Sequence, residues 1–168
     1  FANSLTQANS ANPISGSGLN TGAFSINQSG VIETRGDTDW FKIVVNNPGT
    51  LSLNAASGAT YNTMLDIRMD LIDANGVTVS TSDPTTDVTA SISVSVSAGT
   101  YFVKIDGVGN GNLTTGYSDY GSLGTYRITG TTPAPAPTNV TAAYSAGTLT
   151  LTGDTGANTV TVTLKSGV

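Results

Sequence analysis

The stretch that decides the fold is LDIRMDLIDANGVTV, residues 65–79. Its first half alternates with a period of two, which is the side-chain period of a β-strand. One face would carry Leu65, Ile67, Met69 and Leu71, and the other Asp66, Arg68, Asp70 and Ile72. Asn75-Gly76 suits a two-residue hairpin connection, because both positions tolerate positive φ angles. We therefore expect a core strand whose acidic side chains are solvated on the opposite face.

Short alternating segments of the same kind lie on both sides of this hairpin. Strands are predicted over residues 23–27, 31–33, 40–45, 50–54, 92–96, 100–106 and 125–129, with a long Gly-rich loop at 107–124. In the segment 40–45 we expect Trp40, Val45 and either Phe41 or Ile43 to be buried. Residues 1–11 lack an apolar helical stripe, so we expect an extended or irregular start with one short helical turn. The fold class is therefore all-β: an antiparallel jelly-roll-like β-sandwich, then a short linker and a β-hairpin segment.

The linker is predicted from TTPAPAPT, residues 131–138, in which three prolines at alternate positions stiffen the chain. It separates a sandwich domain at 1–130 from a hairpin segment at 139–168, where 149–151 and 160–164 alternate around a turn at 153–158. An isolated hairpin is marginal in water. We therefore expect this segment to pack on the first domain, to begin a second β domain, or to pair with another subunit.

Composition excludes several classes of function. The sequence has neither His nor Cys, which removes Ser-His-Asp triads, Cys-His pairs and the usual zinc sites. A net charge of −5 with six Lys and Arg argues against a nucleic-acid partner. No apolar run approaches the roughly 20 residues of a membrane span. An enzyme would need paired carboxylates, yet Glu33 is the only glutamate and no acidic pair is marked by its context, so we expect no catalysis.

The turn before residue 40, TRGDTD at 34–39, admits three interpretations. Arg35-Gly36-Asp37 spells an adhesion tripeptide, which would need a protruding, mobile loop. Alternatively, Gly36 makes a sharp turn and Asp37 caps it with a side-chain hydrogen bond, and we favour this reading. The third interpretation is a calcium site, because Ca²⁺ takes six to eight oxygens. Its carboxylates would be Asp37, Asp39 and, from the Gly-rich loop, Asp119.

Two tyrosines of the Gly-rich loop, Tyr117 and Tyr120, are candidate ligand-binding residues for a protein or a glycan. Aromatic side chains of this kind supply contact area and a polar tip. Tyr101 and Tyr126 fall on inward strand positions instead, so we expect them in the core.

Five motifs occur in an order that resembles the bacterial pre-peptidase C-terminal domain family. They are GDTDWFKIVV (36–45), GTLSLNA (49–55), LDIRMDLIDANGVTV (65–79), SAGTYFVKIDG (97–107) and GYSDYGSLGTYRITG (116–130). The resemblance covers roughly residues 1–130. It implies a non-catalytic β-sandwich attached to a secreted hydrolase, often a metallopeptidase, and similar to the collagen-binding modules of collagenases. It also implies calcium near the domain's start, although the acidic residues usual before a stretch like 1–4 are absent here. Residues 147–162 resemble the opening of Gly/Asp-rich repeat regions of secreted bacterial proteins.

These observations favour a non-catalytic accessory or binding module of a secreted bacterial protein of the hydrolase class, located extracellularly or at the cell surface. Its expected partner is an extracellular protein or polysaccharide polymer, and calcium is the only expected cofactor. The alternative is a structural subunit of an extracellular fibre or surface assembly, built by strand exchange between copies of the chain. A chain that starts at Phe1 is expected to be a processed protein or a piece of a longer one.

Overall fold

The computed structural model describes residues 2–10, 25–58, 64–111, 114–134 and 141–153. The sandwich strands are β1 (Ser25–Ile32), β2 (Thr38–Val45), β3 (Gly49–Ser57), β4 (Asp66–Asp73), β5 (Thr78–Ser82), β6 (Ala90–Val96), β7 (Gly99–Val108) and β8 (Gly124–Thr131). They are preceded by helix α1 (Leu5–Ser10) and followed by β9 (Thr141–Ser145) and β10 (Thr148–Thr152). A single 3₁₀ turn, Asp119–Gly121, lies between β7 and β8.

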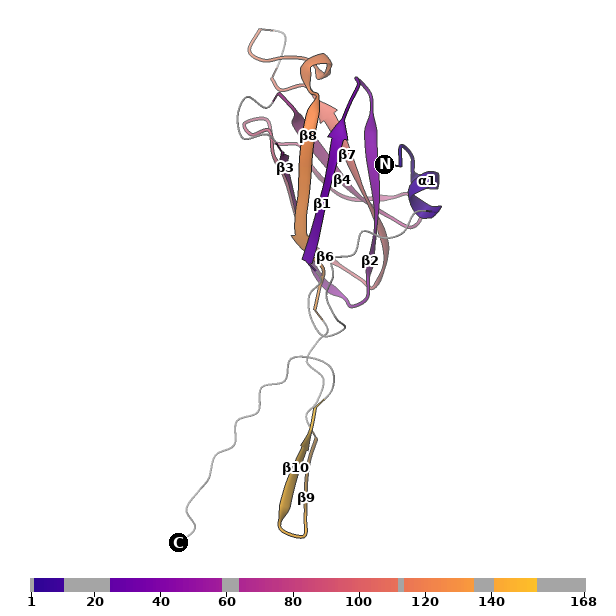
Figure 1. Cartoon of the computed structure of the whole chain (residues 1–168), viewed down its shortest axis with the longest axis vertical. Helices are drawn as coiled ribbons and strands as arrows, with labels where there is room; N and C mark the ends of the chain where they lie inside the picture. Colours follow the sequence, from indigo (N-terminus) through magenta and orange to yellow (C-terminus); the bar gives the residue numbers. More distant parts are fainter. Residues whose placement is uncertain (1, 11–24, 59–63, 112–113, 135–140, 154–168) are drawn as a thin grey trace.

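The eight sandwich strands form two four-stranded antiparallel sheets, β1-β8-β3-β6 and β2-β7-β4-β5 (Figure 1). The chain begins in one sheet, crosses to the other, and returns so that its first and last strands are neighbours. This strand order is that of a jelly roll, in which the two sheets enclose one core. The predicted all-β sandwich is confirmed.

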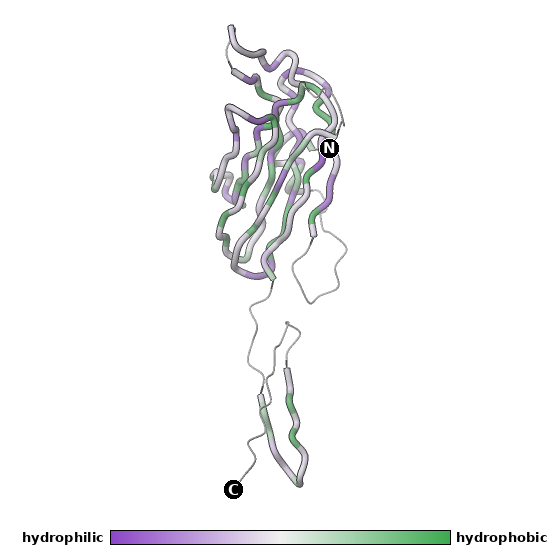
Figure 2. The backbone as a smooth tube through the Cα atoms, turned by 90° about the vertical axis from the view of Figure 1, so that its left-hand side faces the viewer, coloured by the Kyte–Doolittle hydropathy of each residue, from purple (hydrophilic) through white to green (hydrophobic). Residues whose placement is uncertain are grey.

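The core lies between the sheets, and strand alternation builds it from both sides. On β4 and the residue before it, the predicted face is fully buried: Leu65, Ile67, Met69 and Leu71 are 0% exposed. Tyr126 and Ile128 of β8 are buried opposite, as predicted. Figure 2 shows hydrophobic and hydrophilic residues alternating along these strands. Alternation therefore predicted the inward row of both sheets.

Three local predictions were wrong. The two short strands expected at 23–27 and 31–33 are one continuous strand, β1. Trp40 is not a core residue: on β2 the buried row is Asp39, Phe41, Ile43 and Val45, so Trp40 points to the opposite side. Residues Asp66 and Asp70, expected to be solvated, are 1% and 5% exposed. Their burial arises because neighbouring segments cover part of the outer side of β4.

Helix α1 provides one part of this cover. Ala8 packs with Ile72 and Phe102 in a second apolar cluster on the outer side of the β2-β7-β4-β5 sheet. The backbone N–H of Trp40 donates to the carbonyl oxygen of Ala2 at 2.8 Å, which fixes the N-terminal segment beside the edge strand β2. The single helical turn expected in this region is therefore a six-residue helix.

The C-terminal strands β9 and β10 form a hairpin through a turn at Ala146-Gly147. The register pairs Leu149 with Tyr144, so these two apolar side chains share one face of the hairpin, and all ten strand residues are exposed. The predicted hairpin used residues 149–151 and 160–164 instead, and the second of these segments lies outside the described residues. The predicted linker also lies partly outside them: Thr132 and Pro133 are buried at the end of β8, and the domain boundary remains a prediction.

Candidate functional site

The turn before β2 is held at both of its ends. Gly36 has a φ of 78°, a conformation that glycine adopts without strain. The backbone N–H of Glu33 donates to the Asp37 carboxylate at 3.2 Å, and the Asp37 N–H donates to the Thr34 carbonyl at 3.1 Å. These bonds match the favoured interpretation, a glycine turn capped by Asp37. The tripeptide Arg35-Gly36-Asp37 thus lies in a hydrogen-bonded turn, whereas adhesion was expected to need a mobile loop.

Asp39 faces the core rather than solvent. The Tyr126 hydroxyl donates to its carboxylate at 2.5 Å, and Tyr126 in turn packs edge-on against Phe41 at a centroid distance of 6.3 Å. Gly30 lies directly against the Tyr126 ring, where a Cβ would collide with the phenol. Burial raises the pKa of Asp39, while the Tyr126 hydrogen bond opposes that shift. Asp39 is therefore one half of a buried polar pair that joins the two sheets.

The third carboxylate of the predicted calcium set is also engaged. Asp119 accepts a hydrogen bond from the Arg35 guanidinium at 2.9 Å in an exposed ion pair. In the described part of the chain, no group of three or more acidic side chains is arranged so that it could hold a metal ion. Calcium at Asp37, Asp39 and Asp119 stays a prediction, and binding there would have to compete with the partners just described.

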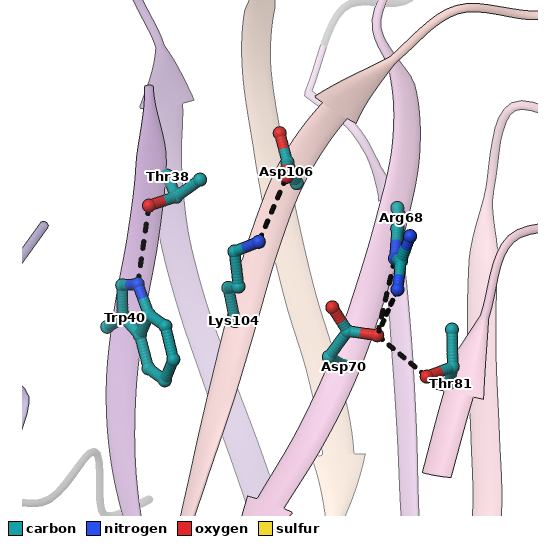
Figure 3. Close-up of polar contacts among 7 residues, drawn as sticks. All are labelled: Thr38, Trp40, Arg68, Asp70, Thr81, Lys104 and Asp106. Atoms are coloured by element: carbon teal, nitrogen blue, oxygen red, sulfur yellow. Dashed lines mark hydrogen bonds and ion pairs between the residues drawn. The ribbon is translucent and has the colours of Figure 1, made fainter. Parts of the chain in front are cut away.

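The outer side of the β2-β7-β4-β5 sheet carries three neighbouring groups of bonded polar side chains, which together we call the polar face (Figure 3). It consists of Thr38, Trp40, Arg68, Asp70, Thr81, Lys104 and Asp106. Cross-strand register places them in rows, because Trp40 pairs with Lys104 and Lys104 pairs with Asp70. Strand alternation thus places an aromatic ring and four charges on one side of a rigid sheet.

Ion pairs and hydrogen bonds fix most of these side chains. Lys104 contacts Asp106 at 3.0 Å, and Arg68 contacts Asp70 at 3.3 Å. Asp70 also accepts the Thr81 hydroxyl at 2.7 Å, and the Trp40 indole N–H donates to Thr38 at 3.3 Å. The four charges sum to zero, so the face offers donors and acceptors without a strong net field. Such a surface offers a polar polymer both hydrogen-bond donors and acceptors.

The two candidate tyrosines differ in exposure. Tyr120 is 75% exposed beside the Arg35–Asp119 ion pair, so it is accessible as predicted. Tyr117 is only partly accessible, and its hydroxyl is buried with no hydrogen-bond partner. Burial, followed by the negative charge of Asp66, raises the pKa of Tyr117. Ligand binding by Tyr117 and Tyr120 stays a prediction.

Asp66 is a buried carboxyl that sequence reasoning missed. Its Oδ1 atom is buried and accepts no hydrogen bond. Burial, together with the charge of Asp83, raises the pKa of Asp66 to about 6, and Asn110 partly opposes the shift by hydrogen bonding. The strand pattern predicted only that Asp66 faces away from the core. Its burial depends on loops that no local pattern places over it.

No helix in the described ranges is long and apolar enough to cross a membrane.

Comparisons with known proteins bear on the family. Residues 37–107 match the family model of the bacterial pre-peptidase C-terminal domain. No protein with a curated description matches the sequence. Among solved structures, the chain is similar to the pre-peptidase C-terminal domain of a collagenase from Bacillus anthracis. That match has 10% sequence identity and a TM-score of 0.46, and covers 62% of this chain and 86% of that chain. The match to the family model confirms, for residues 37–107, the resemblance predicted from the motifs.

Proposed function

Starting from the match of residues 37–107 to the bacterial pre-peptidase C-terminal domain, we propose that this chain is a non-catalytic accessory module of a secreted bacterial hydrolase. It binds an extracellular protein or polysaccharide polymer through the polar face. The low charge content of 10% and the absence of Cys suit a small secreted β-domain without disulfides.

The observation that carries this proposal is the fixed geometry of the polar face. Lys104 and Asp106 are about one quarter exposed, so this ion pair is partly desolvated but still reachable. Side chains that are already ordered lose little conformational entropy when a ligand binds. Trp40 adds a large apolar surface beside the charges, and tryptophan is enriched among residues that dominate binding energy. A rigid surface of this composition suits repeated polar contacts along an extended polymer.

The test is a pull-down of the purified chain with insoluble collagen, chitin and cellulose. The variants Trp40→Ala and Lys104→Ala are expected to weaken binding to the retained polymer about tenfold, as for a central interface residue. Arg127→Ala is the matched control, because Arg127 is an exposed basic residue on β8 of the other sheet, bonded to Asn27 at 2.6 Å. Retention of all three variants equally, or of no chain on any polymer, would contradict the proposal.

A second candidate function is a structural subunit that pairs with its own copies, and the exposed hairpin favours it. Tyr144, Leu149 and Leu151 are 74%, 49% and 40% exposed. The hairpin carries no charged residue between Thr141 and Thr152, so copies would not repel each other there. Sedimentation of the chain and of a Leu149→Thr, Leu151→Thr variant separates the two functions. Assembly that is lost in the variant supports a structural subunit. A chain that stays monomeric at every concentration excludes this second function.

A further inference from the structure

The four charged side chains of the polar face form a checkerboard (Figure 3). Register places Lys104 of β7 directly opposite Asp70 of β4. Two residues along, Asp106 lies directly opposite Arg68. The sign also alternates along each strand, because Lys104 contacts Asp106 at 3.0 Å and Arg68 contacts Asp70 at 3.3 Å. Each charge therefore has neighbours of opposite sign both along its strand and across the ladder, and no row or strand carries an excess of one sign.

A charged ligand gains little from this checkerboard. A polymer of one charge sign would be attracted by two of the four side chains and repelled by the other two, at nearly the same distance. A charged side chain of a protein ligand could bind Lys104 or Asp106 strongly only by replacing the partner that each already has at 3.0 Å. Exchanging one partly exposed ion pair for another leaves almost no net gain in free energy.

A neutral hydroxyl, in contrast, can bind these ion pairs without breaking them. An ammonium group, a guanidinium and a carboxylate each have more hydrogen-bonding positions than one partner uses. A hydroxyl both donates and accepts, so a single hydroxyl can bridge the cation and the anion of the Lys104–Asp106 pair. Hydrogen bonds to ionised groups are roughly twice as strong as those between neutral groups. The checkerboard therefore favours a ligand that is uncharged and dense in hydroxyls.

An aromatic ring stands at one end of the row that contains Lys104 and Asp70. Trp40 lies opposite Lys104 on β2, and Thr81 lies opposite Asp70 on β5. The row thus crosses β2, β7, β4 and β5, three steps of about 4.8 Å each, or roughly 14 Å in all. Trp40 is half-buried, because its ring packs against the second apolar cluster, and its indole N–H donates to Thr38 at 3.3 Å. A ring fixed in this way can receive the apolar C–H side of a sugar while the neighbouring charges bind its hydroxyls.

We propose that the polar face binds a neutral polysaccharide. Lys104, Asp106 and Arg68 hydrogen-bond the hydroxyls of the polysaccharide, and Trp40 lies against one of its sugar rings. The Arg68 side chain is 42% exposed and reachable, whereas that of Asp70 is 8% exposed and holds Arg68 in place. This inference rests on the proposed function, since it assigns a class of polymer to the same surface. It makes acidic glycans and protein fibres poor ligands.

The experiment compares retention of the full chain on cellulose, chitin, insoluble collagen and heparin-agarose. We expect retention on at least one of the two neutral polysaccharides, and little on collagen or heparin. Raising NaCl from about 0.05 M to about 1 M should change the retained fraction less than about twofold, because no net charge is screened. Retention on collagen or heparin that exceeds that on both polysaccharides, and is lost in Trp40→Ala, would overturn this inference alone. Retention on no polymer, or retention that the polar-face variants leave unchanged, would contradict the proposed function as well.

Asp106→Asn tests the checkerboard itself, because it keeps the shape of the side chain but gives the face a net positive charge. We expect retention on the neutral polysaccharide to weaken about tenfold, since a charge-assisted hydrogen bond becomes a neutral one. We also expect a salt-sensitive retention on heparin-agarose that the wild type lacks.

Asp119→Asn is the matched control, because it also removes the carboxylate of an ion pair, Arg35–Asp119, outside the polar face. It should change neither retention. Equal retention of the two variants on heparin would show that the net charge of the chain, and not the checkerboard, governs selectivity, which would overturn the inference. The comparison of polymers with the wild-type chain holds whether or not either variant folds.

Discussion

Two buried aspartates show how differently one fold can treat the same side chain. Asp39 and Asp66 are 3% and 1% exposed, and burial raises the pKa of both. Asp39 accepts the hydroxyl of Tyr126, whereas one oxygen of Asp66 accepts nothing. A buried polar group that is fully bonded adds to a specific structure, and an incompletely bonded one costs free energy. The comparison assigns a stabilising role to Asp39, whereas ionised Asp66 costs the fold free energy.

We expect the largest loss of stability when Asp39 loses the Tyr126 hydroxyl as its hydrogen-bond donor, because Asp39 then becomes a second unsatisfied buried carboxyl. Tyr126→Phe keeps the ring but leaves Asp39 buried without its partner, so we expect a loss of about 2–3 kcal/mol in the free energy of unfolding. Urea denaturation at neutral pH measures it. Tyr101→Phe is the control, because its hydroxyl bonds the Ser97 carbonyl at an exposed position. Equal losses in the two variants would contradict the special role of the Asp39–Tyr126 pair.

Neutralising Asp66 should raise the free energy of unfolding at neutral pH instead of lowering it. Its folded pKa of about 6 lies above the usual 3.8, so folding favours the protonated form. The resulting stability is complete below pH 3.8 and is lost as the pH rises through 6. The full shift corresponds to about 3 kcal/mol. Because an amide is also costly to bury, Asp66→Asn should gain only about 1–2 kcal/mol at pH 7.5.

The measurement is a series of urea unfolding curves from pH 4 to pH 8 in EDTA, which keeps calcium out of the comparison. Near pH 4 the variant should be less stable than the wild type by about 0.5–1.5 kcal/mol, because Asp66 is then protonated in the folded protein while the amide still costs free energy to bury. A variant that is less stable than the wild type at pH 7.5 would show that ionised Asp66 has an interaction that stabilises the fold.

The smallest effect is expected at the exposed Arg35–Asp119 ion pair. Its side chains are 64% and 37% exposed, so water and salt screen the attraction. Arg35→Ala should change the free energy of unfolding by less than about 0.5 kcal/mol. Thermal unfolding at low and at high salt provides the measurement. If Arg35→Ala lowered the free energy of unfolding as much as Tyr126→Phe, the turn at 34–37 would stabilise the whole sheet and not only its own conformation.

The sequence predicted the inward rows of the sandwich well, because each side chain of a strand has only two possible faces. The core could therefore be reached only by a whole alternating row, as it is by Leu65, Ile67, Met69 and Leu71. In residues 40–45 the prediction for Trp40 was wrong, since Trp40 and Val45 differ in phase and cannot share a face. Strict alternation back from Val45 through Ile43 would have placed Asp39 inward and predicted its pairing with a core donor.

The surroundings of Asp66 could not be predicted in the same way. Its burial depends on Asn110, Tyr117 and Ser122, which are more than forty residues away along the chain. Loop residues carry no periodic signal that tells which strand they cover. The same limit applies to the polar face, where Trp40, Lys104 and Asp70 become neighbours only through the order β2-β7-β4.

The pairing of the first and last sandwich strands has a mechanical consequence. Ser25 of β1 faces Thr131 of β8, so the chain enters and leaves the sandwich at adjacent points. Tension applied at Ser25 and Thr131 themselves would load the hydrogen-bonded pairs between these strands one after another, beginning at that end, and not all at once. The strands β1 and β8 should therefore separate pair by pair under modest force. The sandwich would then act as an extensible joint between the segments on either side of it.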